Sequence, residues 1–117
     1  MVDIIRLKNI TDPLLNQKYI FGLAVVDIEG NSFINNIKDF NRIKELVNIY
    51  KISRDISEEI DKSSLSYLTT ELDDKFFFIA EINKNNLLII DTTVDKYQNL
   101  IRLMFKLLPE LSKIIEA

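Results

Sequence analysis

The stretch IFGLAVVDI at residues 20–28, with EGN at residues 29–31 and SFINN at residues 32–36, decides the fold of this chain. Its first segment is apolar almost throughout, which is typical of a strand in the interior of a sheet. Asp27 ends that strand, and Gly30 supplies the positive φ that a tight turn requires. Together the three segments predict an antiparallel β-hairpin.

The chain after the hairpin predicts one long helix and three strands. Asp39 can cap a helix that runs to about Ile60. Residues 64–72 are rich in serine and threonine, which is typical of an edge strand, whereas residues 76–82 are apolar almost throughout and indicate an interior strand. A fifth strand is predicted at residues 87–91, after a turn of asparagines and one lysine.

Both ends of the chain predict helices. Thr92 and Asp95 have the spacing of a capping box, and the apolar stripe that follows stays in helical phase through Pro109. We therefore expect one continuous closing helix. Near the start, Thr11-Asp12-Pro13 predicts a short helix over residues 12–18. Residues 1–10 fit neither the helical nor the strand period.

These elements predict a single α/β (α+β) domain over residues 1–117. We expect a five-stranded antiparallel sheet, with the long middle helix on one face and the N- and C-terminal helices on the other. A chain of 117 residues has room for one hydrophobic core. No apolar run reaches the ~20 residues of a membrane span, and the first residues lack the pattern of a signal peptide.

The composition argues against several classes of function. A net charge of −3 provides no basic surface for nucleic acid. The absence of cysteine excludes disulfides and thiolate chemistry and fits a reducing compartment. We therefore expect a cytoplasmic protein that binds no nucleic acid and does not insert into a membrane.

No residue pattern indicates catalysis, a metal site or a cofactor. Without histidine or cysteine, a metal would depend on oxygen ligands such as those of Asp73 and Asp74, and the twelve-residue calcium loop is missing. No serine has a histidine to activate it. Gly22 and Gly30 form neither a P-loop nor a dinucleotide fingerprint. We expect a protein that is not an enzyme.

The helix after Asp39 has more apolar surface than one sheet can cover. At 100° per residue its apolar side chains span roughly 200° of the circumference, whereas packing on one sheet needs a stripe only a little over 100° wide. The arc consists of Phe40, Ile43, Leu46, Val47, Ile49, Tyr50, Ile56 and Ile60, and is interrupted by Ser53, Arg54 and Ser57. Another segment of the chain or a partner subunit must cover it, and a patch of this size favours the partner.

The segment GLAVVDIEGN at residues 22–31 resembles the first hairpin of the roadblock family of dynein light chains and its prokaryotic relatives. The resemblance extends through the long helix, the three-strand meander and the closing helix, from about Ile20 to the end. Pro13 departs from the family pattern, because it would break the usual opening helix. The related longin fold shares this core but begins with strands. Residues 1–10 do not decide between an opening helix and opening strands, so both folds stay open.

The resemblance implies a non-catalytic partner of a small Ras-like GTPase that works as a homodimer or with a related roadblock-like subunit. In such dimers the middle helices pack together and the third strands can pair. Carried to this sequence, the resemblance makes residues 64–72 the pairing edge. The interface it implies consists of Leu46, Ile49, Tyr50, Ser53, Ile56, Tyr67 and Thr69.

Three other functions stay open. A longin-type trafficking or assembly adaptor would share the same core. A small-ligand sensing domain would line a cavity with Phe76, Phe77 and Phe78, although these residues also fit a strand buried between two helix layers. The third is a small accessory subunit of a larger enzyme.

Overall fold

The structure, a computed structural model, describes residues 2–37, 39–61 and 65–115. From Ile20 onward its helices and strands follow the order predicted from the sequence. The helices are α1 (Ile4–Thr11), α2 (Phe40–Asp61) and α3 (Tyr97–Ile114), with short 3-10 helices η1 (Asp12–Asn16) and η2 (Val94–Lys96). The strands are β1 (Ile20–Asp27), β2 (Ser32–Asn35), β3 (Tyr67–Leu72), β4 (Lys75–Asn83) and β5 (Asn86–Thr92).

The five strands form one antiparallel sheet in the order β2-β1-β5-β4-β3. β1, β5 and β4 lie in its interior, which explains why their sequences are apolar on both faces. β2 and β3 are the two edges. The predicted five-stranded antiparallel α+β fold is therefore confirmed, including the edge position of β3.

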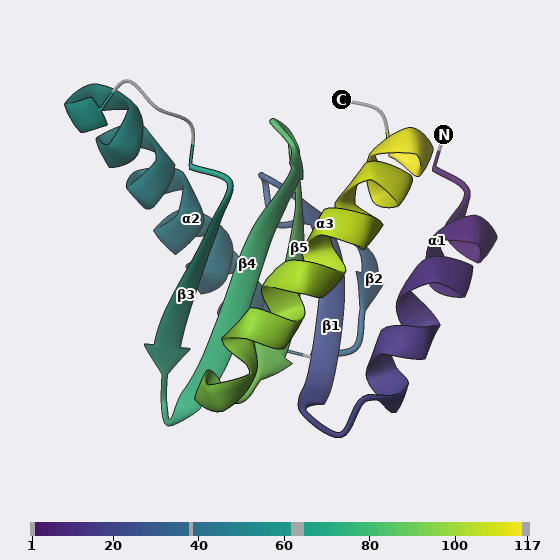
Figure 1. The fold of residues 1–117 in the computed structure, drawn as a ribbon. Helices are drawn as coiled ribbons and strands as arrows, with labels where there is room; N and C mark the ends of the chain where they lie inside the picture. The colour runs from purple at the N-terminus through teal and green to yellow at the C-terminus, as the bar shows by residue number, and fades with distance from the viewer. Residues whose placement is uncertain (1, 38, 62–64, 116–117) are drawn as a thin grey trace.

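The helices cover the two faces of the sheet as expected, with α2 on one face and α1 and α3 on the other (Figure 1). Side chains of β5 alternate between the two cores, because successive residues of a strand point to opposite faces. Leu87 and Ile89 pack with α2. Leu88 and Ile90 pack with α1 and α3. This division leaves each helix layer with its own hydrophobic cluster.

The turn between β1 and β2 is closed by Asp27. Its Oδ1 accepts hydrogen bonds from the backbone N–H groups of Glu29 and Asn31, each at 2.9 Å. Gly30 has a φ of 90°, which side-chain-bearing residues rarely adopt. Both residues thus hold the hairpin geometry, and neither contributes to a site for chemistry.

The N-terminal segment forms a helix where the sequence pattern was ambiguous. Asp3 accepts a hydrogen bond from the backbone N–H of Arg6 at 3.2 Å and so caps α1. Leu7 is buried against α3 and the sheet. Because only one turn of α1 is buried, the sequence does not show a clear helical repeat of apolar residues. Pro13 lies in the first turn of η1, so the predicted helix over residues 12–18 is a 3-10 helix that ends at Asn16.

The start of the closing helix differs from the capping-box prediction. Thr92 is the last residue of β5, and its hydroxyl donates to the backbone carbonyl of Tyr19 at 2.8 Å. It therefore ties β5 to the start of β1, and α3 begins only at Tyr97, after η2. The prediction of one helix running through Pro109 is confirmed.

The strand predicted at residues 64–72 begins at Tyr67, and Ser64 itself lies outside the described residues. Among the described residues, no helix combines the length and the apolar character needed to span a bilayer.

Candidate functional site

Helix α2 buries part of the interface predicted from the sequence under its own sheet. Leu46 and Tyr50 are both 0% exposed. Neither side chain is therefore available to a second molecule. The structure thus corrects the predicted interface, which included both residues. Ile49 and Ser53 are half-buried, whereas Ile56 is 50% exposed. The apolar arc divides into a face that packs on the sheet and a face that does not.

The uncovered face of α2 carries a row of isoleucines. Ile52, Ile56 and Ile60 are exposed to 60%, 50% and 74% of their surface. Together with the half-buried Ile49 they have spacings of three and four residues, which place them on one side of a helix. We call these four residues the isoleucine stripe. Ile52 was not among the residues predicted from the sequence, although its spacing from Ile49 and Ile56 could have revealed it.

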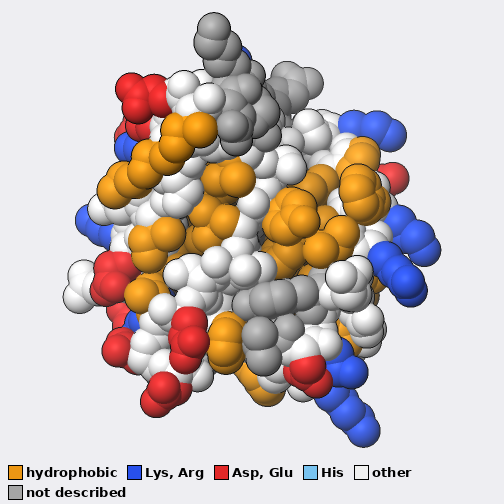
Figure 2. Space-filling view, turned by 60° about the vertical axis from the view of Figure 1, so that its left-hand side comes forward, with side chains coloured by type: hydrophobic (Ala, Val, Ile, Leu, Met, Phe, Trp, Pro, Cys, Tyr) orange, Lys and Arg blue, Asp and Glu red, His pale blue; other side chains and the backbone are white. Residues whose placement is uncertain are grey.

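Three members of the isoleucine stripe, Ile49, Ile56 and Ile60, lie on the flank of α2 that faces β3, and Ile52 lies on the side away from the sheet. The opposite flank faces the β1–β2 hairpin, since a Cβ added to Gly30 would lie 3.2 Å from Cγ of Lys44. Ile49, Ile56 and Ile60 lie roughly 120–160° round the helix from Lys44. Figure 2 shows this side of the molecule, where hydrophobic side chains gather over a wide area.

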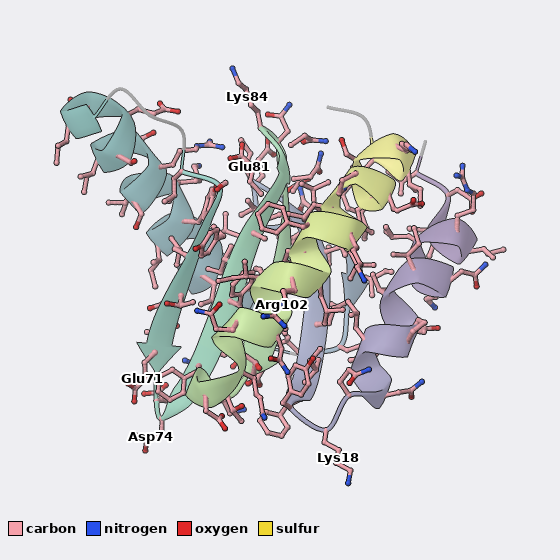
Figure 3. All side chains as sticks on the ribbon, viewed as in Figure 1. Lys18, Glu71, Asp74, Glu81, Lys84 and Arg102 are labelled. Carbon is pink, nitrogen blue, oxygen red and sulfur yellow. The ribbon has the colours of Figure 1, made fainter. Side chains whose placement is uncertain are left out.

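Strand β3 offers a free edge beside the stripe. It pairs with β4 and is the last strand of the sheet. Tyr67 is 44% exposed and Thr69 is exposed, while Leu68 and Leu72 turn toward the α2 core. β3 carries a single charged residue, Glu71, at its end (Figure 3). An edge with so little charge and no proline is not protected against pairing with another strand.

A polar cluster fixes the position of α2 against the sheet. The Tyr50 hydroxyl lies 2.8 Å from the carbonyl oxygen of Leu65 and 2.9 Å from Oε2 of Glu81. It carries one hydrogen, so it donates to one of these acceptors at a time. Arg54 donates to the carbonyl of Lys84 at 3.0 Å and approaches Glu81 at 3.4 Å. Burial, followed by the charge of Glu81, raises the pKa of Tyr50 well above its usual value.

The described residues contain no cluster of three or more acidic side chains that could hold a metal ion. Asp73 and Asp74, the pair considered from the sequence, form the β3–β4 turn with φ values of 51° and 64°. Asp73 accepts a hydrogen bond from Arg42 at 2.7 Å. This pair therefore serves the hairpin and its contact with α2.

The consecutive phenylalanines of β4 fill the two cores. Phe77 is buried on the α2 face and Phe78 on the opposite face, each 1% exposed. Phe76 is half-buried. β4 is therefore a strand buried between two helix layers, which is one of the two interpretations that the sequence allowed. Phe78 also lines an apolar hollow of about 230 Å³ together with Tyr67 and Phe105. This hollow has few of the convergent polar groups that the sensing function would need.

No protein-family model matches the sequence, and a comparison with curated proteins gave no match. Solved structures do match over almost the whole chain. A roadblock/LC7 domain from Streptomyces avermitilis has a TM-score of 0.74 at 10% identity, with 97% of each chain covered. The gliding protein MglB from Thermus thermophilus has a TM-score of 0.80 at 8% identity, covering 97% of this chain and 90% of that chain.

A third structure, MglB in a tetrameric arrangement, has a TM-score of 0.76 at 10% identity and covers 97% of this chain and 90% of that chain. At these identities the likeness concerns the fold alone. The chain has the roadblock fold, so the resemblance drawn from the order of its elements is confirmed at that level.

Proposed function

We propose that this protein is a non-catalytic, dimeric scaffold or regulator that binds a small Ras-like GTPase. The observation that carries the proposal is the isoleucine stripe of α2 beside the free edge of β3. The proposed interface therefore consists of Ile49, Ile52, Ser53, Ile56 and Ile60 on α2 and of the backbone edge of β3. At this edge the side chains of Tyr67 and Thr69 lie on the α3 side of the sheet, where they would flank a paired partner strand. Leu46 and Tyr50 lie on the buried side of α2 and pack it against the sheet, so they hold this surface in place.

Burial of the stripe supplies a driving force for association. Covering the exposed part of each of Ile52, Ile56 and Ile60 contributes about 1–2 kcal/mol. A two-fold axis beside α2 sets the stripe of one copy against the stripe of the other, because a symmetric dimer uses the same patch twice. The same axis brings two β3 edges together, where backbone groups without partners can form a continuous ladder.

The fold supports an assembly role. Structures with the same fold include the gliding protein MglB and an MglB structure with a tetrameric arrangement. The GTPase partner is what the roadblock resemblance implies, and the exposed apolar surface of α2 supports the dimer. A related roadblock-like subunit would bind to the same stripe, since the stripe needs only a complementary apolar helix.

Binding to a GTPase can be tested with purified components. Small Ras-like GTPases, each loaded with GDP or with a non-hydrolysable GTP analogue, are passed over the immobilised protein. We expect one GTPase to be retained in one nucleotide state and released in the other. Retention of none of them, or equal retention in both states, would contradict the proposal. Ile5→Glu, an exposed position on α1, serves as a control that should retain the GTPase equally well.

A further inference from the structure

Charge is distributed unevenly between the two sides of this protein. Residues 2–19 and 94–115, which form α1, α3 and the short segments beside them, contain seven lysines and arginines and four acidic residues. The rest of the chain contains eight lysines and arginines and fourteen acidic residues. The net charge of −3 therefore hides an excess of positive charge on the face of the sheet that α1 and α3 cover (Figure 1).

The two helices on this face carry most of that positive charge. α1 and α3 pack into one hydrophobic cluster, and we call them the α1–α3 layer. The layer has one acidic side chain, that of Glu110. The ion pairs found among the described residues involve none of its cations. These cations are all exposed, and they are Arg6, Lys8, Arg102, Lys106 and Lys113.

The outer side of α3 combines cations with exposed apolar side chains. Phe105 is 79% exposed, although it is a large aromatic residue. Leu100 and Leu111, which are buried, lie on the other side of the helix. Arg102 points outward from α3 in Figure 3. Spacings of three and four residues place five exposed side chains on one outward ridge, namely Arg102, Phe105, Lys106, Pro109 and Lys113.

Helix α1 repeats this combination. Ile5 is 74% exposed and lies roughly 160° round the helix from Leu7, which is buried against the sheet. Lys8 lies roughly 60° from Ile5 on the same outer side. Each helix of the layer therefore presents an exposed apolar side chain beside cations. This combination is typical of helices that lie on a membrane surface, where apolar groups reach below the headgroups and cations stay among them.

A hollow of about 270 Å³ lies next to the outward ridge of α3. It is lined by Tyr19, Asn99, Arg102, Leu103 and Lys106. Four of these side chains can donate hydrogen bonds, and no acidic side chain is among the described residues that line it. A guanidinium and an ammonium group beside neutral donors suit a phosphate group, since they supply both charge and directed hydrogen bonds.

We propose that the α1–α3 layer binds the surface of a membrane that contains anionic phospholipids. The phosphate of one headgroup occupies the hollow beside Arg102 and Lys106, and Phe105 and Ile5 reach into the boundary between headgroups and acyl chains. Five cations on two neighbouring helices fall within the number that attracts a protein to anionic lipid. This contact is peripheral and requires no helix to span the bilayer.

The exposed apolar residues favour a membrane over an acidic protein or a nucleic acid. An acidic polymer would pair with the cations but would offer polar surface to Phe105 and Ile5. A bilayer accepts both kinds of side chain at one surface. The proposal goes beyond the GTPase scaffold, because the α1–α3 layer and the isoleucine stripe lie on opposite faces of the sheet. A membrane and a partner at α2 can therefore be bound at the same time.

Vesicle binding by the full chain tests the proposal. The protein is mixed with sucrose-loaded vesicles of phosphatidylcholine alone, or of phosphatidylcholine with about 30% phosphatidylserine, which supplies the anionic charge. The bound fraction is measured by sedimentation at low and at high salt. We expect binding to the phosphatidylserine vesicles to be about tenfold or more tighter at low salt, with a difference that shrinks at high salt.

Charge variants locate the surface that binds. Arg102→Glu/Lys106→Glu should weaken binding to the phosphatidylserine vesicles about tenfold or more. Lys44→Glu/Lys51→Glu on α2 makes the same change of net charge on the opposite face and should leave binding within about twofold.

An aromatic variant separates apolar contact from charge. Phe105→Ala should weaken binding about threefold or more, including at high salt, where the charges are screened. Phe21→Ala removes an aromatic that is 62% exposed on β1, outside the layer, and should leave binding within about twofold.

Several results would overturn the proposal. Equal binding to both kinds of vesicle is one, and the absence of binding at millimolar lipid is another. Equal losses from the charge variants on α3 and on α2 would show that only the net charge acts. Tighter binding of poly-glutamate or of a short DNA duplex, measured by fluorescence anisotropy, would make an acidic polymer the partner.

Inorganic phosphate serves as a separate probe of the hollow. If phosphate alone saturated the NMR shifts of Arg102 at micromolar concentration, the hollow would be a site for free phosphate and the proposal would be wrong. A monomeric protein, or one that retains no GTPase, leaves the vesicle test unaffected, because α2 takes no part in it. The two proposals can therefore fail separately.

Discussion

The hydroxyl of Tyr50 lies 2.9 Å from Oε2 of Glu81, and this contact joins the middle of α2 to the far part of β4. Arg54, one turn along, approaches the same carboxylate at 3.4 Å and lies 5.8 Å over the Tyr50 ring. Rotation of α2 about its axis would break these contacts. The cluster therefore holds the isoleucine stripe toward solvent while Leu46 and Tyr50 stay buried.

Tyr50→Phe removes the hydroxyl and leaves the ring in place. We expect the free energy of unfolding to fall by about 1 kcal/mol, because the Leu65 carbonyl and Glu81 lose a hydrogen-bond donor. Urea denaturation monitored by circular dichroism measures this change. Tyr67→Phe is the matched control, and its half-exposed ring should leave stability within about 0.5 kcal/mol. An equal loss in both variants would contradict the role given to the cluster.

Alkaline pH tests the same hydroxyl in another way. Burial raises the pKa of Tyr50 above that of an unfolded tyrosine, so at high pH the unfolded chain releases this proton first. The contribution of Tyr50 is fully present below pH ~10 and is lost as pH rises above it. We expect wild-type stability to fall more steeply above pH ~10 than that of Tyr50→Phe. Parallel curves would show that the hydroxyl titrates normally.

Asp91 is expected to oppose folding at neutral pH. It is 8% exposed on an interior strand, and its nearest cation is Nζ of Lys75 at 4.0 Å. Burial raises the pKa of Asp91, with Lys75 acting in the opposite direction. As pH rises above ~3.9, the carboxyl of the unfolded chain loses its proton while that of the folded protein still holds it. The free energy of unfolding therefore falls as pH rises through this range.

Asp91→Asn removes this ionisation with little change of shape. We expect the variant to be more stable than wild type at pH 7, by up to about 1 kcal/mol, and the difference to shrink as pH falls toward 4. Thermal denaturation across that pH range measures it. Asp55→Asn, at an exposed position of α2, should show no such trend. A destabilised Asp91→Asn at pH 7 would mean that the contact with Lys75 outweighs the cost of burial.

Gly30 tests the hairpin that decides the fold. With a φ of 90°, it occupies a region that alanine enters only at a cost, so Gly30→Ala should lower stability by about 1 kcal/mol. Gly30→Asn should cost less, since asparagine tolerates positive φ better. Chemical denaturation of the two variants gives the comparison. Equal stability of wild type and Gly30→Ala would show that the turn relaxes.

The sequence predicted the sheet because the strands carry their own signals. β1, β4 and β5 are apolar on both faces, and the short turns between neighbouring strands leave few alternatives for pairing. The N-terminal helix could not be recognised, since Leu7 and Thr11 are its only buried residues. Thr92 misled the capping prediction, because a hydroxyl that caps helices also binds a distant carbonyl, here that of Tyr19.

The surface of α2 was predicted only in part. A wide apolar arc indicates excess hydrophobic surface but does not show which edge of the arc faces the sheet. Tyr50 settles the orientation through Glu81, a residue 31 positions away that no local pattern connects to it. The apolar hollow between α3 and the β3–β4 pair was equally hidden, because its residues Tyr67, Phe78 and Phe105 come from three elements that only the fold brings together.

The mass of the protein in solution tests the proposed interface most directly. Light scattering at micromolar concentration should give about 27 kDa for wild type, twice the 13.7 kDa of one chain. Ile56→Glu should give one chain, because it places a charge in the middle of the stripe, while Ile5→Glu on α1 should remain a dimer. A wild-type mass of 13.7 kDa, or an Ile56→Glu variant as dimeric as wild type, would contradict the account.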